Sequence, residues 1–147
     1  NLAKCGFAED DYNGQKRFVD MLTDFAREYD VHIQLCLHMR KAENEDKPLG
    51  KFDIKGTGAI TDMVDTVLSL WRNKRKEADR RIANLAGESF DETEYPDAIL
   101  NCHKQRNGED EPSVRLWFDM ESHQYVETQG GRPYRYVPFT AKQEVAI

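Results

Sequence analysis

Two cations at alternate positions of a strand-like segment are the clearest chemical feature of the sequence. Lys104 and Arg106 belong to the run Lys104-Gln105-Arg106-Asn107-Gly108, at the tip of a predicted hairpin. Alternate residues of a strand point to the same side, so both side chains can be directed at a single phosphate. A solvated hairpin edge, where a lysine discourages strand-to-strand aggregation, is the competing interpretation.

A second segment, Lys55-Gly56-Thr57-Gly58, combines two glycines with a charge and a hydroxyl group. The glycines let the backbone approach an anion closely, while the lysine and threonine side chains add a charge and a donor. The segment is not a P-loop, because the spacing G-x-x-x-x-G-K-[ST] is missing from the whole chain. A plain turn and a site for nucleic-acid backbone phosphates both stay open.

His38 comes directly after a predicted buried strand over 31–37. Ligands of open α/β sheets collect at the carboxyl ends of strands, so His38 is a candidate for sensing a phosphate or orienting a water. A hydrogen-bonded structural histidine fits the same position. The four histidines and three cysteines have no metal-ligand spacing. Cys102 and His103 are neighbours in a predicted strand and would point to opposite faces, which argues against a catalytic dyad.

Composition limits the classes of protein that fit. The chain has 147 residues and a net charge of −6, which suits one domain and argues against a surface coated for nucleic-acid binding. Contact through a few loops lining a channel is still compatible with that charge. Apolar runs are too short for a transmembrane helix, residues 1–6 do not resemble a signal peptide, and the cysteines are expected to be reduced. We therefore expect a cytoplasmic-type protein.

Periodic patterns predict the elements that carry these residues. Apolar residues at helical spacing predict a helix over 15–29, and the charged segment 73–87 is predicted to be an exposed helix. Strand-like patterns recur at 31–37, 66–71, 97–106, 114–119 and 124–127. The dipeptide Asn107-Gly108 predicts a hairpin turn. Together they predict an α/β fold whose mostly parallel sheet is flanked by helices and ends in an antiparallel hairpin.

Taken in order, these motifs resemble the C-terminal motor of DnaB-type replicative helicases, and still more the phage helicase-primase and mitochondrial Twinkle branch. Asn1-Leu2 is similar to the residues directly after the family's Walker B aspartate, and 35–41 is similar to its sensor strand. Residues 52–60, continuing through 64–68, resemble the DNA-binding loop and the strand after it. Lys104 to Gly108 matches the K-x-R-x-G signature of the arginine-finger hairpin. The resemblance covers about residues 1–128 and leaves 129–147 as an irregular tail.

The resemblance implies the C-terminal part of a RecA-like ATPase fold in a hexameric ring that uses ATP and Mg²⁺. It implies that His38 senses the γ-phosphate, and that Lys104 and Arg106 act on ATP bound by the neighbouring subunit. It further implies a set of residues that hold single-stranded DNA: Arg40, Lys41, Lys55, Gly56, Thr57 and Gly58. The cell would be a bacterium or a phage-infected cell.

One departure from the family separates the whole protein from this chain. The Walker A lysine and threonine, the catalytic glutamate and the Walker B aspartate would all precede Asn1, so we expect this chain alone neither to bind nor to hydrolyse ATP. Two alternatives stay open. One is another RecA-type ATPase, such as a recombinase or a KaiC-like regulator, and the other is a non-catalytic DNA-binding or oligomerisation module.

Overall fold

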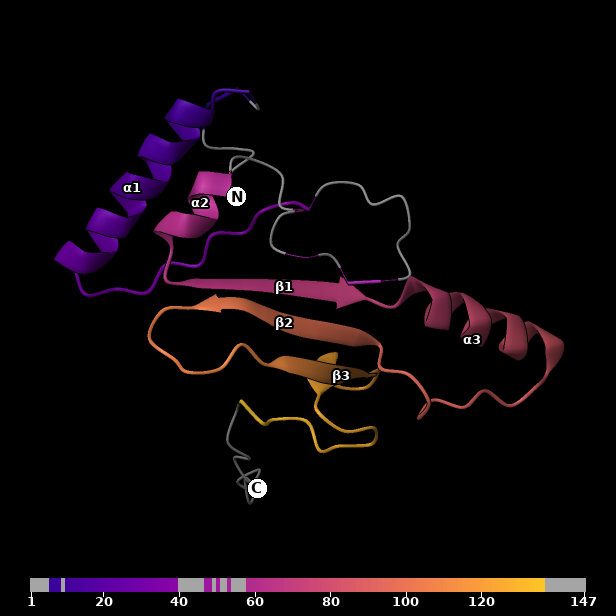
Figure 1. Cartoon of the computed structure of the whole chain (residues 1–147). Helices are drawn as coiled ribbons and strands as arrows, with labels where there is room; N and C mark the ends of the chain where they lie inside the picture. Colours follow the sequence, from indigo (N-terminus) through magenta and orange to yellow (C-terminus); the bar gives the residue numbers. More distant parts are fainter. Residues whose placement is uncertain are drawn as a thin grey trace, which may run out of the picture.

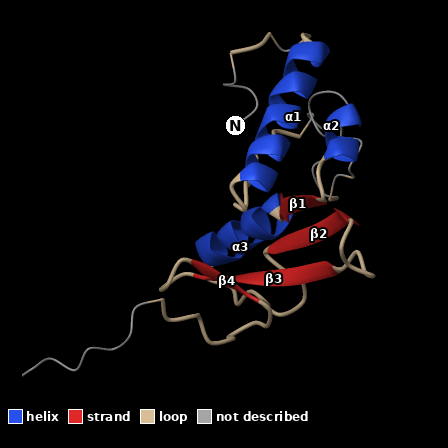
Figure 2. Cartoon of the chain, turned by 90° about the vertical axis from the view of Figure 1, so that its left-hand side faces the viewer, coloured by secondary structure: helices blue, strands red, loops and turns tan. Residues whose placement is uncertain are grey.

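The computed structural model describes residues 6–8, 10–39, 47–48, 50, 53 and 58–136. Two helices, α1 and α2, lie on one side of a small sheet, and a third helix, α3, projects from the opposite end of the molecule (Figure 1). In a view turned by 90°, the strands form one layer, and α1 and α2 lie beyond its β1 edge (Figure 2).

Helix α1 spans Tyr12–Glu28 and confirms the helix predicted from apolar spacing. It begins where the Asp11 side chain accepts a hydrogen bond of 2.8 Å from the Gly14 amide, which satisfies one of the unpaired amides of the first turn. Its buried face meets the short helix α2, Gly58–Met63, where Val19 and Ile60 form the centre of the core.

The described sheet is antiparallel throughout, with the strand order β1-β2-β3-β4. The strands are β1 Thr66–Arg72, β2 Ala98–Gln105, β3 Ser113–Asp119 and β4 Gln124–Val126. Each lies within two residues of a predicted strand. The turn at Asn107-Gly108 leads from β2 into β3, so the predicted hairpin is confirmed.

The prediction of a mostly parallel, RecA-like sheet is wrong. Every strand pair of the described sheet is antiparallel, and residues 31–37 form no strand although they were expected to be one. Their alternating pattern reflects burial without strand pairing: Leu35 and Leu37 pack against the core of α1 and α2. An apolar alternation reports that one side is covered, but it does not say whether the cover is a neighbouring strand or a helix.

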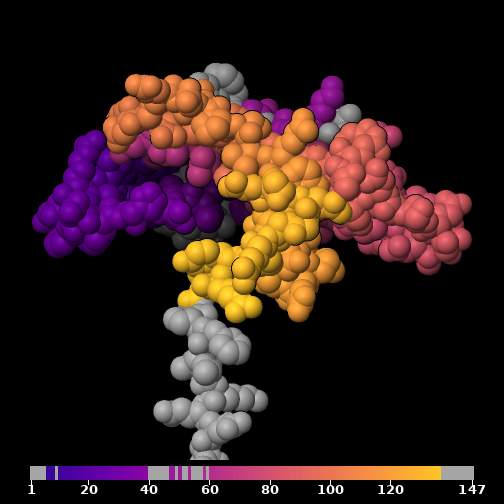
Figure 3. Space-filling model, turned by 90° about the horizontal axis from the view of Figure 1, so that it is seen from below, coloured from indigo at the N-terminus to yellow at the C-terminus, as the bar shows by residue number. Residues whose placement is uncertain are grey.

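Helix α3, Lys74–Ala86, lies in the connection between the adjacent strands β1 and β2. Asn73 caps its start by accepting from the Lys76 amide at 3.0 Å, and Gly87 ends it with a left-handed φ of 72°. The predicted exposed helix is thus confirmed. Seen from below, α3 forms the end of the molecule opposite to α1 (Figure 3).

The chain after β4 continues without helix or strand as far as Tyr136, the last described residue. The remainder of the tail predicted over 129–147 lies outside the described residues. None of the helices in the described part of the chain has the length and apolar character needed to cross a membrane.

Candidate functional site

The two cations of the K-x-R-x-G run converge at the C-terminal end of α2. Lys104 Nζ donates to the carbonyl oxygens of Thr61 at 2.9 Å and Asp62 at 2.8 Å. Arg106 Nη2 donates to the same Asp62 oxygen at 3.1 Å. We call Lys104 and Arg106 the cation pair. The predicted target was a single phosphate, and the group that both cations contact here is the Asp62 carbonyl oxygen.

The position of the cation pair is explained by the electrostatics of a helix end. The last carbonyls of a helix have no partner within it and carry partial negative charge, so cations are stabilised there. Arg106 is held further by Asp65, through a side-chain ion pair of 3.1 Å and a backbone hydrogen bond of 2.9 Å. The Arg106 side chain is still 46% exposed, so it is accessible to a ligand from solvent.

Strand alternation alone does not explain how the cation pair forms. Arg106 lies just beyond β2, in the turn, and the register of β2 against β1 shifts before Lys104. Leu68 pairs with Cys102 while Val67 pairs with Lys104, which leaves His103 as the extra residue of a β-bulge. Bulges redirect side chains locally, so the convergence depends on both the bulge and the turn.

The bulge also produces a contact that the sequence did not indicate. His103 Nε2 lies 2.7 Å from Ser69 Oγ, across β1 and β2. Among the described residues, no carboxylate bonds the other ring nitrogen of His103, so the pair lacks the third group of a hydrolytic triad. We interpret it as a cross-strand structural hydrogen bond.

The other predicted site residues are only partly covered by the structure. His38 is exposed and follows the segment 31–37, which forms no strand, so it does not stand at the end of a strand as expected. Gly58 is the first residue of α2, so the predicted DNA-binding loop leads directly into the helix whose far end contacts the cation pair. The remaining members of the predicted set lie outside the described residues: Arg40, Lys41, Lys55, Gly56 and Thr57.

A second charged site joins α3 to the sheet. Lys76 Nζ lies 3.1 Å from Asp97 Oδ1 and donates to the Glu92 carbonyl at 3.0 Å. Arg80 Nη2 lies 2.7 Å from the same Asp97 oxygen and also pairs with the Glu92 carboxylate. We call these four residues the α3 cluster. The Lys76 side chain is 2% exposed and that of Asp97 10%, so the charges at its centre are desolvated.

The environment of Asp97 keeps it ionised. Burial alone would raise the pKa of Asp97, but hydrogen bonds from the Phe118 amide, Arg80 and Lys76 outweigh burial and hold the pKa below its ordinary value. The Phe118 amide donates to Asp97 Oδ2 at 2.9 Å, while Oδ1 accepts from the two cations. Both carboxylate oxygens are therefore occupied, which is typical of a structural role.

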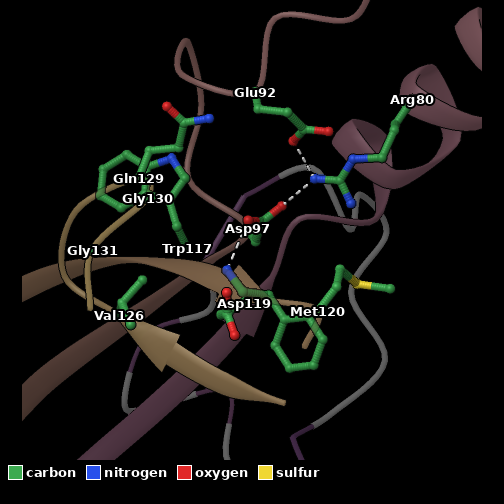
Figure 4. A pocket seen from close by; sticks show the side chains of 11 residues that line it. Arg80, Glu92, Asp97, Trp117, Asp119, Met120, Val126, Gln129, Gly130 and Gly131 are labelled. Carbon is green, nitrogen blue, oxygen red and sulfur yellow. Dashed lines mark hydrogen bonds and ion pairs between the residues drawn. The ribbon is translucent and has the colours of Figure 1, made fainter. Parts of the chain in front are cut away.

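Three members of the α3 cluster, Arg80, Glu92 and Asp97, form one wall of a pocket of about 330 Å³ (Figure 4). Trp117 and the loop Gln129–Gly131 form the facing wall. Arg80 Nε and Trp117 Nε1 are both buried, and no acceptor among the described residues bonds either of them. Such N–H groups normally find a partner, so these two are exceptions among the buried polar groups of the described residues.

The α3 cluster was not predicted from the sequence, although one signal for it was present. Lys76 and Arg80 are spaced i, i+4 on a helix, which places both cations on one face. Their acidic partners come from the loop after α3 and from the start of β2, and no local pattern indicates which acids these are.

No protein-family model matches the chain, and no curated protein matches it. Within the described residues there is also no group of three or more His, Cys, Asp or Glu side chains that could hold a metal ion. Functional conclusions therefore depend on the geometry of the cation pair and on the motifs of the sequence.

Proposed function

We propose that the chain is part of an ATP-dependent ring helicase that moves along single-stranded DNA, and that Lys104 and Arg106 act on ATP bound by a neighbouring subunit. The observation that supports this most is that both cations bond one oxygen, the Asp62 carbonyl, at 2.8 and 3.1 Å. Two cations on one oxygen can equally neutralise a phosphate oxygen. The proposed activity is based on the resemblance of the K-x-R-x-G run. It does not depend on the predicted parallel sheet, which the structure contradicts.

The bonds of the cation pair are weak enough to be exchanged for a phosphate. The Arg106–Asp65 ion pair has exposed fractions of 46% and 53%, and surface pairs of this kind contribute about 0–1 kcal/mol. Phosphoryl transfer depends mainly on positioning and charge neutralisation, to which an arginine from a neighbouring subunit contributes roughly 10³–10⁵ in rate. Release from α2 therefore costs little compared with the gain at the phosphate.

The same exchange supplies a route from ATP to DNA. Lys104 and Arg106 bond the last turn of α2, and Gly58 of the proposed DNA-binding loop begins that helix. When the cations move to a phosphate, α2 loses the charges that stabilise its C-terminal end. Hydrolysis in one subunit would then alter the position of the loop that contacts DNA.

The other assignments are part of this proposal. His38 senses the γ-phosphate, while Arg40, Lys41 and the segment Lys55 to Gly58 hold the backbone of single-stranded DNA. Backbone contacts suit a motor that must move along any sequence. Mg²⁺ and the ATP phosphates would be bound largely by residues that precede Asn1 in the family, and we assign no described residue to the metal. The compartment is the cytoplasm of a bacterial or phage-infected cell.

The test compares single-strand-stimulated ATPase activity of the intact protein with that of its Arg106→Ala variant. We expect a fall of about 10³-fold or more in kcat, with ATP binding retained, because the arginine acts in the transition state. Arg115→Ala removes another exposed arginine, on β3, and should leave the activity unchanged. Unchanged hydrolysis in Arg106→Ala would refute the proposed role.

A second candidate is a non-catalytic DNA-binding or oligomerisation module. It is favoured by the hydrogen bonds that the cation pair already makes, since these account for both residues without any ligand. Such a module would bind single-stranded DNA or assemble, while the intact protein showed neither ATP hydrolysis nor duplex unwinding.

A further inference from the structure

Two helices, α1 and α3, lie at opposite ends of the molecule (Figures 1 and 3). Both expose large apolar side chains to solvent. On α3, Ile82 is 65% and Leu85 is 84% exposed. On α1, Met21 and Phe25 are exposed as well, beside the buried face that meets α2. These are large residues grouped by helical spacing rather than scattered singly, and grouped apolar residues mark interaction surfaces.

The charges beside the two apolar strips are mainly opposite in sign. On α3, Ala78, Ile82 and Leu85 share one face, with the exposed cations Arg75 and Arg81 on either side of it. We call this face the α3 strip. One exposed acid, Asp79, lies beside Arg75 and pairs with it at 3.9 Å.

On α1, Met21 and Phe25 lie beside the exposed acids Asp24 and Glu28, and we call this the α1 strip. Arg17, one turn before Met21, is a base on the same side. A mainly basic border on the α3 strip thus matches a mainly acidic border on the α1 strip, as electrostatic complementarity across an interface requires.

We infer that the α3 strip of one copy docks on the α1 strip of a second copy of this chain, with Arg75 and Arg81 facing Asp24 and Glu28. The two strips lie at opposite ends of one molecule, so they meet only between copies. A contact between two different surfaces repeats head to tail and closes into a ring when the rotation allows. The inference rests on the ring assembly of the proposed function, but not on its chemistry.

The test uses two charge-reversal variants of the intact protein. The first carries Arg75→Glu and Arg81→Glu on α3, and the second carries Asp24→Lys and Glu28→Lys on α1. In either variant alone, both strips have borders of the same sign, so we expect self-association to weaken about 10- to 100-fold in Kd. Sedimentation equilibrium at low salt measures the Kd.

Mixing the two variants separates this interface from a general charge effect. In an equimolar mixture, each α3 strip again finds an α1 strip of opposite sign on the other variant, so association returns to within about threefold of the wild-type Kd. A single chain with all four substitutions should assemble likewise. Arg115→Glu, an exposed charge on β3 outside both strips, is the matched control and should leave the Kd unchanged.

Unchanged assembly in either variant, or no recovery on mixing, would overturn the inference and assign the strips to another partner. Leu85→Asp supplies a second measurement that does not depend on the arginines. This residue is 84% exposed, so the substitution should preserve folding, and normal assembly of the variant would also count against the inference. Loss of ATPase in Arg106→Ala is scored separately, so a failed interface and a failed helicase function give different results.

Discussion

The cation pair and the α3 cluster both tie a helix to the sheet through two cations, yet they do so in opposite environments. Lys104 and Arg106 bond neutral carbonyls at the end of α2, and the Arg106 side chain is 46% exposed. Lys76 and Arg80 bond ionised carboxylates, and the Lys76 side chain is 2% exposed. The same residue types are thus held by weak, exchangeable contacts in one region and by desolvated ion pairs in the other.

This difference indicates which region is available for function. Removing one partner from a buried ion pair leaves an uncompensated charge and costs about 3–5 kcal/mol, whereas an exposed pair contributes about 0–1 kcal/mol. The α3 cluster therefore cannot release its cations without destabilising the connection from β1 to β2. The cation pair can leave α2 at small cost, which is the property required of residues that act on a ligand.

The largest expected effect comes from breaking the α3 cluster at its centre. Asp97→Ala removes the acceptor of Lys76, Arg80 and the Phe118 amide, and should lower the free energy of unfolding by about 3 kcal/mol or more. Urea unfolding followed by tryptophan fluorescence measures this. Asp79→Ala removes an exposed aspartate of α3 and should cost less than about 0.5 kcal/mol. Equal costs would show that the burial of Asp97 has no energetic consequence.

Acid should weaken the same cluster without any substitution. The folded state lowers the pKa of Asp97, so this residue contributes stability above its unfolded pKa of about 4, and that stability is lost as the pH falls through the lower folded pKa. The effect should be smaller than that of Asp97→Ala, because a protonated carboxyl group keeps an oxygen acceptor. Unfolding free energies measured between about pH 7 and pH 3 test this.

Asp97→Asn is the matched variant for the pH series. The folded state also lowers the pKa of Glu77 and Asp119, through hydrogen bonds from Arg72 and Ser122 respectively, so the wild-type slope reports several groups. The difference in slope between wild type and Asp97→Asn isolates Asp97. Parallel pH profiles for the two proteins would contradict the prediction.

Local structure was predictable from the sequence because neighbouring residues determine it. The apolar spacing of α1, the Asn73 cap and Gly87 end of α3, and the Asn107-Gly108 turn each act within a few residues. The strand predicted at 31–37 was wrong because its alternating pattern indicates that one side of the segment is buried. The pattern does not indicate whether a strand or a helix covers that side. The prediction of a parallel sheet relied on that strand and on the resemblance. Because the strand does not form, the predicted parallel sheet was wrong as well.

In the candidate site, too, local features could be predicted from the sequence and contacts between distant segments could not. The convergence of Lys104 and Arg106 depends on the β-bulge at His103 and on the turn beyond β2, and the sequence indicates only the spacing of the two cations. Their acceptors belong to α2, far earlier in the chain, and are visible only in three dimensions. The α3 cluster was not predicted because its members are distant in the sequence. Asp97, directly before β2, contacts Lys76 and Arg80 of α3 only in the folded chain.

The smallest expected effect on stability comes from the cation pair, and it sharpens the contrast with the α3 cluster. Lys104→Met and Arg106→Ala should each lower the free energy of unfolding by about 1 kcal/mol or less, because the lost bonds join partly exposed cations to carbonyls at a helix end. Urea unfolding under the conditions used for Asp97→Ala gives the comparison, and Asp65→Asn tests the Arg106 ion pair alone. A cost near 3 kcal/mol, about that of a broken buried pair, would make the cation pair a structural clamp. A small cost beside a roughly 10³-fold loss of ATPase in the same Arg106→Ala protein would show that a folded molecule had lost only its catalytic contribution.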